Sequence, residues 1–160
     1  MRFSLALMSA LFGHPPLSAQ AEEFEGPFFG EVLRVIDGDT FDARVNIWPD
    51  VTTEVSIRIR GIDAPEMHRS EDCEEEAYYG SLARLELEDM LPNGTEVRLE
   101  YIEPGSFSGR FIADVLRRNT ERGSRIDTMM MRTDYVVPWS PGDDAVDWCA
   151  HFQALGVQPE

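Results

Sequence analysis

The chain contains no lysine, and all 14 of its basic residues are arginine. This absence excludes a Walker phosphate-binding loop, a Schiff-base lysine and a serine–lysine nucleophile, because each needs the lysine amine. Positive charge of any kind is scarce, since 30 acidic residues give a formal net charge of -16. Such acidity keeps a protein soluble and is typical of proteins from saline environments. It also weakens non-specific attraction to polyanions such as nucleic acid.

Long hydrophobic runs are also missing, since even the apolar run from Phe3 to Phe12 is too short to span a bilayer. That run follows Arg2 and is followed by the small-residue pattern Ala19-Gln20-Ala21, which is typical of a secretory signal peptide. We expect removal near Ala21 and export from a bacterial cell to the periplasm or the medium. Loss of Arg2 would change the net charge from -16 to -17. A disordered or membrane-anchored tail is the alternative.

Cysteine is scarce too, with only Cys73 and Cys149. A zinc site would need more nitrogen or sulfur ligands, and after the presequence only His68 and His151 could supply them. In an oxidising compartment a Cys73–Cys149 disulfide is the better prediction. It would close a loop of about 75 residues, worth about 4–5 kcal/mol in the chain-entropy model. Two buried free thiols are the alternative.

The length of 160 residues and a hydrophobic fraction of 42% predict one globular domain. We expect a signal peptide over 1–21 and a single domain over 22–160, with its core at about 30–139 and a tail over 140–160. No internal repeat or low-complexity segment interrupts it.

Alternation of apolar and polar residues predicts five short strands. They cover Glu31–Ile36, Thr40–Ile47, Glu54–Ile62, Glu96–Ile102 and Phe111–Leu116, and Asp37-Gly38 supplies a hairpin turn between the first two. The period changes over Cys73–Leu91, where Tyr78, Leu82 and Leu85 predict the apolar face of a helix. Shorter helices are predicted over Ile126–Arg132 and Ala145–Phe152.

Five strands with one helix between the third and the fourth predict a mainly β, α+β domain: a five-stranded OB-fold barrel with short C-terminal helices. A Rossmann-like fold is excluded because strands and helices do not alternate and no glycine fingerprint follows the first strand.

Carboxylates gather at two turns. Asp37 and Asp39 flank Gly38, Asp63 and Glu66 flank Ala64-Pro65, and Arg58 lies on the strand between the two turns. Oxygen ligands without a His or Cys cluster suit a hard cation such as Ca²⁺ or Mg²⁺. Each piece alone has a plainer interpretation: a solvated hairpin tip, a helix entry capped by Asp63, and an exposed sheet arginine.

The ordered set is more specific. "VIDGDT", "IRIRGIDAPE", an amphipathic helix, "NGTEVRLE" and "SGRFIADV" follow one another between Val32 and Trp139. In this order they resemble the staphylococcal nuclease (thermonuclease) family. The resemblance implies an OB barrel and a Ca²⁺-dependent endonuclease that hydrolyses phosphodiester bonds of DNA and RNA, leaving 3′-phosphate ends.

The resemblance also implies roles for single residues. Asp39 and Asp63 look like the direct calcium ligands, with help from the backbone carbonyl of Ala64. Asp37 would reach the metal through water, as would Glu66, which is also similar in position to the family's general base. Arg58 and Arg110 look like the two phosphate-binding arginines.

Four positions depart from the family pattern. Ala64 stands in place of a threonine, but the ligand there is a backbone carbonyl, so little is lost. Ser106 and Ser108 stand where the family usually has an aspartate and a tyrosine before the second arginine, so the phosphate-contacting phenol is missing. Asp134 stands where the family often has a glycine, and aspartate tolerates the left-handed conformation better than most residues.

Nucleic acid is therefore the expected substrate of a monomer without stable membrane association. The alternative is a catalytically inactive OB-fold module that binds calcium, a nucleotide or a protein partner. A phosphatase of the haloacid-dehalogenase type would need a longer α/β scaffold, which the strand-rich pattern does not supply.

Overall fold

The computed structural model describes residues 23–67, 73–118, 124–140 and 142–156. The predicted signal peptide lies outside the described residues, and so does His68. Within these ranges, no helix combines the length and the apolar character needed to cross a membrane.

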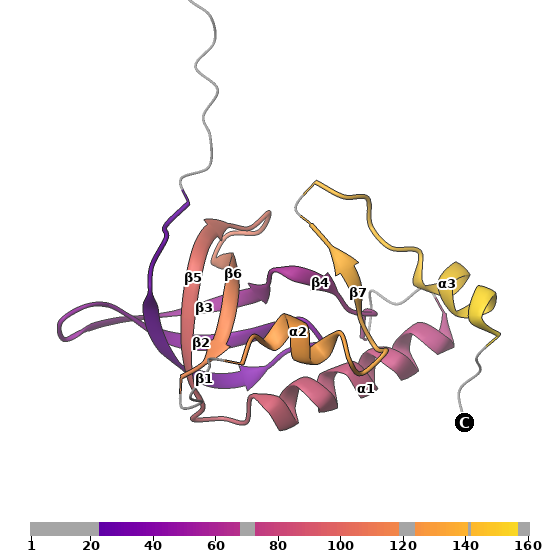
Figure 1. Ribbon diagram of the computed structural model, residues 1–160, viewed down its shortest axis with the longest axis horizontal. Coiled ribbons are helices and arrows are strands. Elements are labelled where there is room, and N and C mark those ends of the chain that lie inside the picture. The colour runs from indigo at the N-terminus through magenta and orange to yellow at the C-terminus, as the bar shows by residue number, and fades with distance from the viewer. Residues whose placement is uncertain (1–22, 68–72, 119–123, 141, 157–160) are drawn as a thin grey trace, which may run out of the picture.

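Five strands form a closed barrel in the order β1-β2-β3-β6-β5 (Figure 1). They are β1 (Phe28–Val35), β2 (Thr40–Trp48), β3 (Val51–Ile59), β5 (Glu96–Pro104) and β6 (Arg110–Arg117). All neighbours are antiparallel except β3 and β6, which run parallel. The prediction of a five-stranded, OB-like α+β domain is confirmed.

The third predicted strand, Glu54–Ile62, was wrong at its end. The barrel strand stops at Ile59, and Gly61 has a φ of 93°, which turns the chain out of the barrel. The next residues form β4 (Gly61–Asp63), which pairs with β7 (Val137–Trp139) in a separate two-stranded sheet. Asp63 consequently lies beside the barrel, opposite Val137, and not on a barrel strand.

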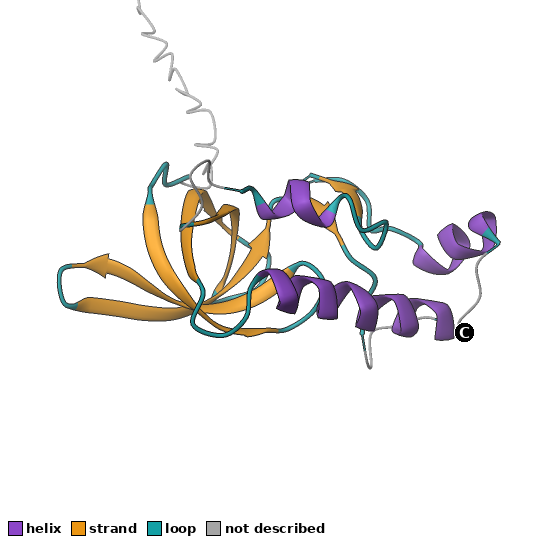
Figure 2. Ribbon diagram, turned by 60° about the horizontal axis from the view of Figure 1, so that its bottom comes forward, coloured by secondary structure: helices purple, strands orange, loops and turns teal. Residues whose placement is uncertain are grey.

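Three helices complete the described chain: α1 (Glu74–Met90), α2 (Ile126–Met130) and α3 (Trp148–Leu155). Figure 2 shows α1 along the side of the molecule, with α3 at its far end. The Cys73–Cys149 disulfide joins the start of α1 to α3, with a Cα–Cα distance of 6.0 Å. All three predicted helices exist, although the last begins three residues later than Ala145.

The predicted apolar face of α1 was partly wrong. Leu85 is 55% exposed, and the buried positions are Glu76, Gly80, Ala83 and Leu87. The reason is close packing: a Cβ at Gly80 would lie 2.6 Å from the backbone oxygen of Glu66. The helix therefore presents the small residues Gly80 and Ala83 where it lies closest to the chain beneath it, and Leu87 to the core.

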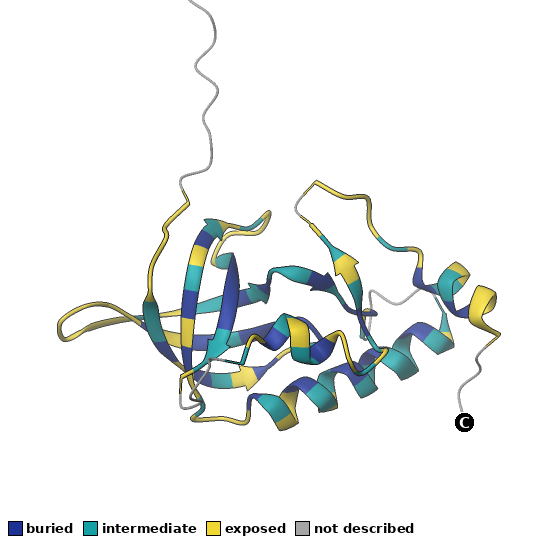
Figure 3. Ribbon diagram, in the orientation of Figure 1, coloured by how far each residue is buried: buried dark blue, intermediate teal, exposed yellow. Residues whose placement is uncertain are grey.

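The core lies within the barrel and continues under α1 and α2. Figure 3 shows the buried segments concentrated on the barrel strands and on one side of each of these helices. The largest fully buried side chains include Phe41, Ile57 and Leu99 from the barrel and Leu87 and Met130 from the helices.

Candidate functional site

Two strand ends place the acidic residues around one arginine. Asp39 directly precedes Thr40, the first residue of β2, and Thr40 pairs with Arg58 on β3. The backbone N–H of Ile59 donates to the carbonyl of Asp39, which holds the turn against β3. Asp63 approaches the same arginine from β4.

The guanidinium of Arg58 bridges two carboxylates. One terminal nitrogen donates to Asp39 Oδ1 at 2.9 Å, and the other donates to Asp63 Oδ1. The guanidinium carbon also lies 4.9 Å from the centre of the Trp139 ring. Burial by itself lowers the pKa of Arg58, but attraction to the carboxylates of Asp39 and Asp63 outweighs that effect. The net pKa is raised, so the guanidinium stays protonated.

Asp39 is the most deeply buried of the acidic group, at 2% exposure. Its carboxylate also accepts hydrogen bonds from Thr40 Oγ1 at 2.7 Å and from the backbone N–H of Ala64 at 3.0 Å. Burial, followed by repulsion from Asp37, raises the pKa of Asp39 well above its usual value, and Arg58 opposes the rise. The bond from Ala64 ties the β2 turn to the segment after β4.

Asp37 closes the turn by accepting the backbone N–H of Asp39 at 3.0 Å. The predicted hairpin turn is present, but its glycine is not explained by the left-handed backbone conformation that such turns often require. Gly38 does not have a positive φ. A Cβ there would lie 2.5 Å from the Cβ of Ala83 and 2.7 Å from that of Ala64, so glycine is needed for space.

Glu66 is an exposed residue that follows the buried Pro65. Its backbone N–H donates to Glu76 Oε1 at 3.3 Å, so the buried Glu76 of α1 fixes this segment. Partial desolvation of its carboxylate, and then repulsion from Asp37, raises the pKa of Glu66. Residues 64–67 are not helical, so a helix entry capped by Asp63 was the wrong interpretation.

Arg110 is not brought into this group. It begins β6 beside Ser56, and its guanidinium lies 5.0 Å from the centre of the Phe107 ring. It lines an open hollow of about 400 Å³ with Asp42, Ser56 and the loop 107–109, and Asp39, Asp63 and Glu66 are not among the residues lining that hollow. The register Ser56–Arg110 and Arg58–Ile112 places both arginines on the outer face of the barrel, about two residues apart along the strands.

Trp148 is a member of the group that sequence reasoning missed. Its indole Nε1–H donates to Asp63 Oδ2 at 3.1 Å, although the two residues are 85 positions apart. It comes from α3, in the predicted tail, where no periodic pattern indicated a site residue. The only signal was its position directly before Cys149.

The acidic residues do not form a ready-made metal cage. Within the described ranges, one group of three His, Cys, Asp or Glu side chains has ligand atoms within 4.8 Å of one another: Cys73, Glu76 and Cys149. Its sulfurs are joined in the disulfide, so it offers no thiolate. His151 is one of the two histidines considered as zinc ligands, and its ring packs edge-on against that of Trp148.

The donor set nevertheless fits a hard cation by its chemistry. All the donors are oxygens, and the carboxylates of Asp37, Asp39, Asp63 and Glu66 outnumber the charge of Arg58. Burial is the main cause of the raised pKa values of Asp39 and Glu66, and repulsion from neighbouring carboxylates, Asp37 first among them, adds to it. A divalent cation with oxygen ligands would relieve that repulsion.

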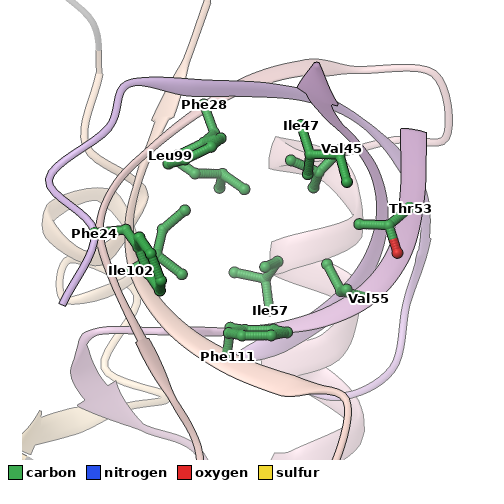
Figure 4. Close-up of a pocket in the computed structure, with 10 residues that line it drawn as sticks. All are labelled: Phe24, Phe28, Val45, Ile47, Thr53, Val55, Ile57, Leu99, Ile102 and Phe111. Atoms are coloured by element: carbon green, nitrogen blue, oxygen red, sulfur yellow. The ribbon is translucent and has the colours of Figure 1, made fainter. Parts of the chain in front are cut away.

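A separate cavity of about 240 Å³ opens inside the barrel (Figure 4). Figure 4 shows its side chains converging on an open centre from the five barrel strands and from Phe24, which precedes β1, and all but Thr53 are apolar. It contains none of the acidic group, so it is not part of the candidate site.

No protein-family model matches the chain, and no curated protein matches it. The geometry of the site is therefore the basis for a functional assignment.

Proposed function

We propose that the chain is a Ca²⁺-dependent nuclease that hydrolyses phosphodiester bonds of DNA and RNA to 3′-phosphate products. The observation that carries the proposal is the guanidinium of Arg58 held between the carboxylates of Asp39 and Asp63. Glu66 lies nearby, and its pKa is raised by partial burial and then by repulsion from Asp37, with a smaller contribution from Asp63. A purely structural barrel has no evident use for this excess of carboxylates around one arginine.

Arg58 would bind the phosphate undergoing attack. Its planar guanidinium can hold two phosphate oxygens at once and does not lose its proton. Its present contacts with Asp39 and Asp63 fix its direction before substrate arrives. Fixed positive charge aimed at the phosphoryl oxygens stabilises the transition state more than the ground state, because negative charge grows there during in-line attack.

Glu66 would take the proton of the attacking water. A raised pKa makes its carboxylate a better base than an ordinary glutamate, and its exposure leaves it reachable by water and substrate. Asp39, Asp63 and the Ala64 carbonyl would hold calcium, with Asp37 acting through water. The bound ion would supply charge neutralisation at the phosphate.

We further propose an exported, periplasmic or extracellular protein that acts as a monomer without stable membrane association. The Cys73–Cys149 disulfide supports export, because such bonds persist in oxidising compartments.

An inactive OB-fold binding module is the second candidate, and one observation favours it. Arg58 is fully engaged by carboxylates, while Arg110 lies in a different hollow against Phe107. In this alternative the acidic group binds calcium without hydrolysis, and the outer face of the barrel holds a nucleotide or a protein partner.

The test is a cleavage assay with single-stranded and plasmid DNA and with RNA, in calcium and in EDTA. Glu66→Gln is the informative variant because Glu66 is exposed and its loss leaves no buried group unpaired. Glu88→Gln, on the exposed side of α1, is the matched control. Calcium-dependent products with 3′-phosphate ends, lost in the Glu66 variant alone, are expected. Calcium binding without cleavage would favour the binding module.

A further inference from the structure

We propose that Trp148 is a positioning residue for Asp63, and that the Cys73–Cys149 disulfide keeps it in place. The inference rests on the proposed function, since it concerns the same acidic group. It assigns the C-terminal helix α3 to the site, as a part that oxidation secures and reduction releases.

The contact itself is direct. Asp63 has one carboxylate oxygen bonded to Arg58 and the other to the indole N–H of Trp148. Trp148 is only 4% exposed, so water competes weakly for this bond. Together the two donors hold both oxygens of Asp63, which fixes the rotation of its carboxylate. Hydrogen bonds to a ligating carboxylate are the usual means of orienting it toward a metal.

The position of Trp148 depends on α3, and α3 is held to α1 in two ways. The disulfide joins Cys149, the next residue, to Cys73 at the start of α1. Phe152, one turn further along, stacks on Trp148 with ring centres 5.5 Å apart and on Tyr79 of α1 at 4.5 Å. A helix of eight residues is too short to be stable alone, so these attachments keep it folded at the site.

Reduction removes the covalent attachment. A dithiol such as dithiothreitol would transfer two electrons and two protons to the disulfide, giving two thiols on the protein and one oxidised reagent. The chain has no other cysteine, so the reagent has no other target. Non-covalent contacts, chiefly the aromatic stack and the hydrogen bond to Asp63, would then hold α3, and Trp148 would leave Asp63 for part of the time.

The test compares Trp148→Phe with Trp48→Phe by calorimetric titration with Ca²⁺, by cleavage kinetics and by melting temperature. Phenylalanine keeps the stack and removes the N–H donor. Trp48 is 74% exposed at the end of β2, far along the chain from the site, so it controls for the loss of an indole. We expect calcium affinity about tenfold weaker in Trp148→Phe, the lower end of what orienting partners contribute. The Trp48 variant should match the wild type.

The second arm uses the disulfide. Cys73→Ser/Cys149→Ser, and reduced wild type, should weaken calcium binding in the same direction as Trp148→Phe. Adding Trp148→Phe to the double serine variant should cost less than it costs in the oxidised protein, because both changes act through one contact. This arm remains informative should Trp148→Phe fold poorly.

The outcomes separate the two proposals. Calcium affinity and turnover of Trp148→Phe equal to those of Trp48→Phe would overturn the positioning role and leave the nuclease standing. A wild type that binds calcium but cleaves nothing would overturn the nuclease, while the calcium affinities would still decide the role of Trp148. A wild type that neither binds calcium nor cleaves would overturn both.

Discussion

Arg58 lies between two carboxylates that would otherwise repel each other, and its role differs from that of a surface arginine. It stabilises the turn before β2 and the segment of β4 at the same time, through one planar group. Lysine carries the same charge but only one nitrogen, so it cannot make both contacts in this geometry.

Arg58→Lys should therefore lower the rate of DNA cleavage about 100- to 1,000-fold, the usual effect of removing one transition-state donor. Initial rates at saturating calcium would measure it. Arg44→Lys is the matched control, because Arg44 is an exposed residue of the same sheet that pairs with Glu54. Similar losses in both variants would mean that positive charge on the sheet matters, and not the bridge.

Asp39 predicts a dependence of stability on pH in the calcium-free protein. Its pKa is raised in the folded state above the ordinary value of 3.8, chiefly by burial. As the pH rises from that value through the folded pKa, the unfolded chain loses its proton first, so the free energy of unfolding falls. Urea unfolding in EDTA would measure this fall, and Asp39→Asn should lack it. Parallel pH profiles for wild type and variant would contradict the prediction.

At the scale of single residues, the sequence grouped Asp39, Asp63 and Arg58 in one candidate site, and the structure brings these three side chains into contact. The sequence did not predict that Arg58 bridges the two carboxylates, since it assigned this arginine to a phosphate. It did not predict the contact of Asp63 with Trp148, which depends on a helix packed from the far end of the chain. It also grouped Arg110 with Arg58, and the strand register places the two on one face of the barrel, although the Arg110 guanidinium lies over the Phe107 ring.

Helix α1 is the element that brings the site segments together. Its Gly80 lies against the backbone of Pro65 and Glu66, and its Ala83 lies against the turn at Gly38. The helix can approach this closely only because the facing side chains are small. The distance between α1 and the barrel therefore determines the position of the segment that contains Glu66.

Gly80→Ala should push α1 away from that segment. The added Cβ would lie 2.6 Å and 2.7 Å from two backbone oxygens, which cannot rotate away. Overpacking costs about 1–3 kcal/mol and the helix gain of alanine offsets about 1 kcal/mol of it, so we expect a net loss of up to about 2 kcal/mol. Urea unfolding measures the loss, and cleavage should fall with it. Leu85→Ala on the exposed side should stay within about 0.5 kcal/mol of the wild type.

Strands such as β2 and β5 were predictable because they alternate apolar and polar residues, and one buried face fixes such a pattern. In β6 four consecutive residues are buried, so its short apolar run was the signal. The small β4–β7 sheet was not predictable, since three-residue strands carry too few side chains to show a period, and their pairing spans more than 70 residues. The positive φ of Asp134, 62°, was predicted correctly from the tolerance of aspartate for that conformation.

The whole molecule carries a charge of the same sign as the proposed substrate, with a formal net charge of -16. Proteins that bind nucleic acid through basic surfaces release the counterions bound to the phosphates. That release favours binding less as the salt concentration rises, so their affinity falls. This chain should show the opposite trend at low salt, since screening removes a long-range repulsion.

We expect kcat/KM for DNA cleavage to rise between about 10 and 150 mM NaCl at constant calcium, as the Debye length falls from about 30 Å to about 8 Å. Initial rates on a long duplex would measure the trend. A dinucleotide with a single phosphodiester carries little charge and should respond far less. A rate that falls steadily with salt on both substrates would contradict the prediction.

Closure of the barrel depends on partners that lie far apart in the chain. Strand β1 pairs with β5, and β3 pairs with β6 across the segment that contains α1. A chain that has emerged from the ribosome only as far as α1 can form the β1–β2–β3 meander, but both outer strands remain without partners. Such high contact order slows folding and leaves strand edges open to other chains. A chain that folds late stays open to a translocase for longer, which is what the export proposed above would require.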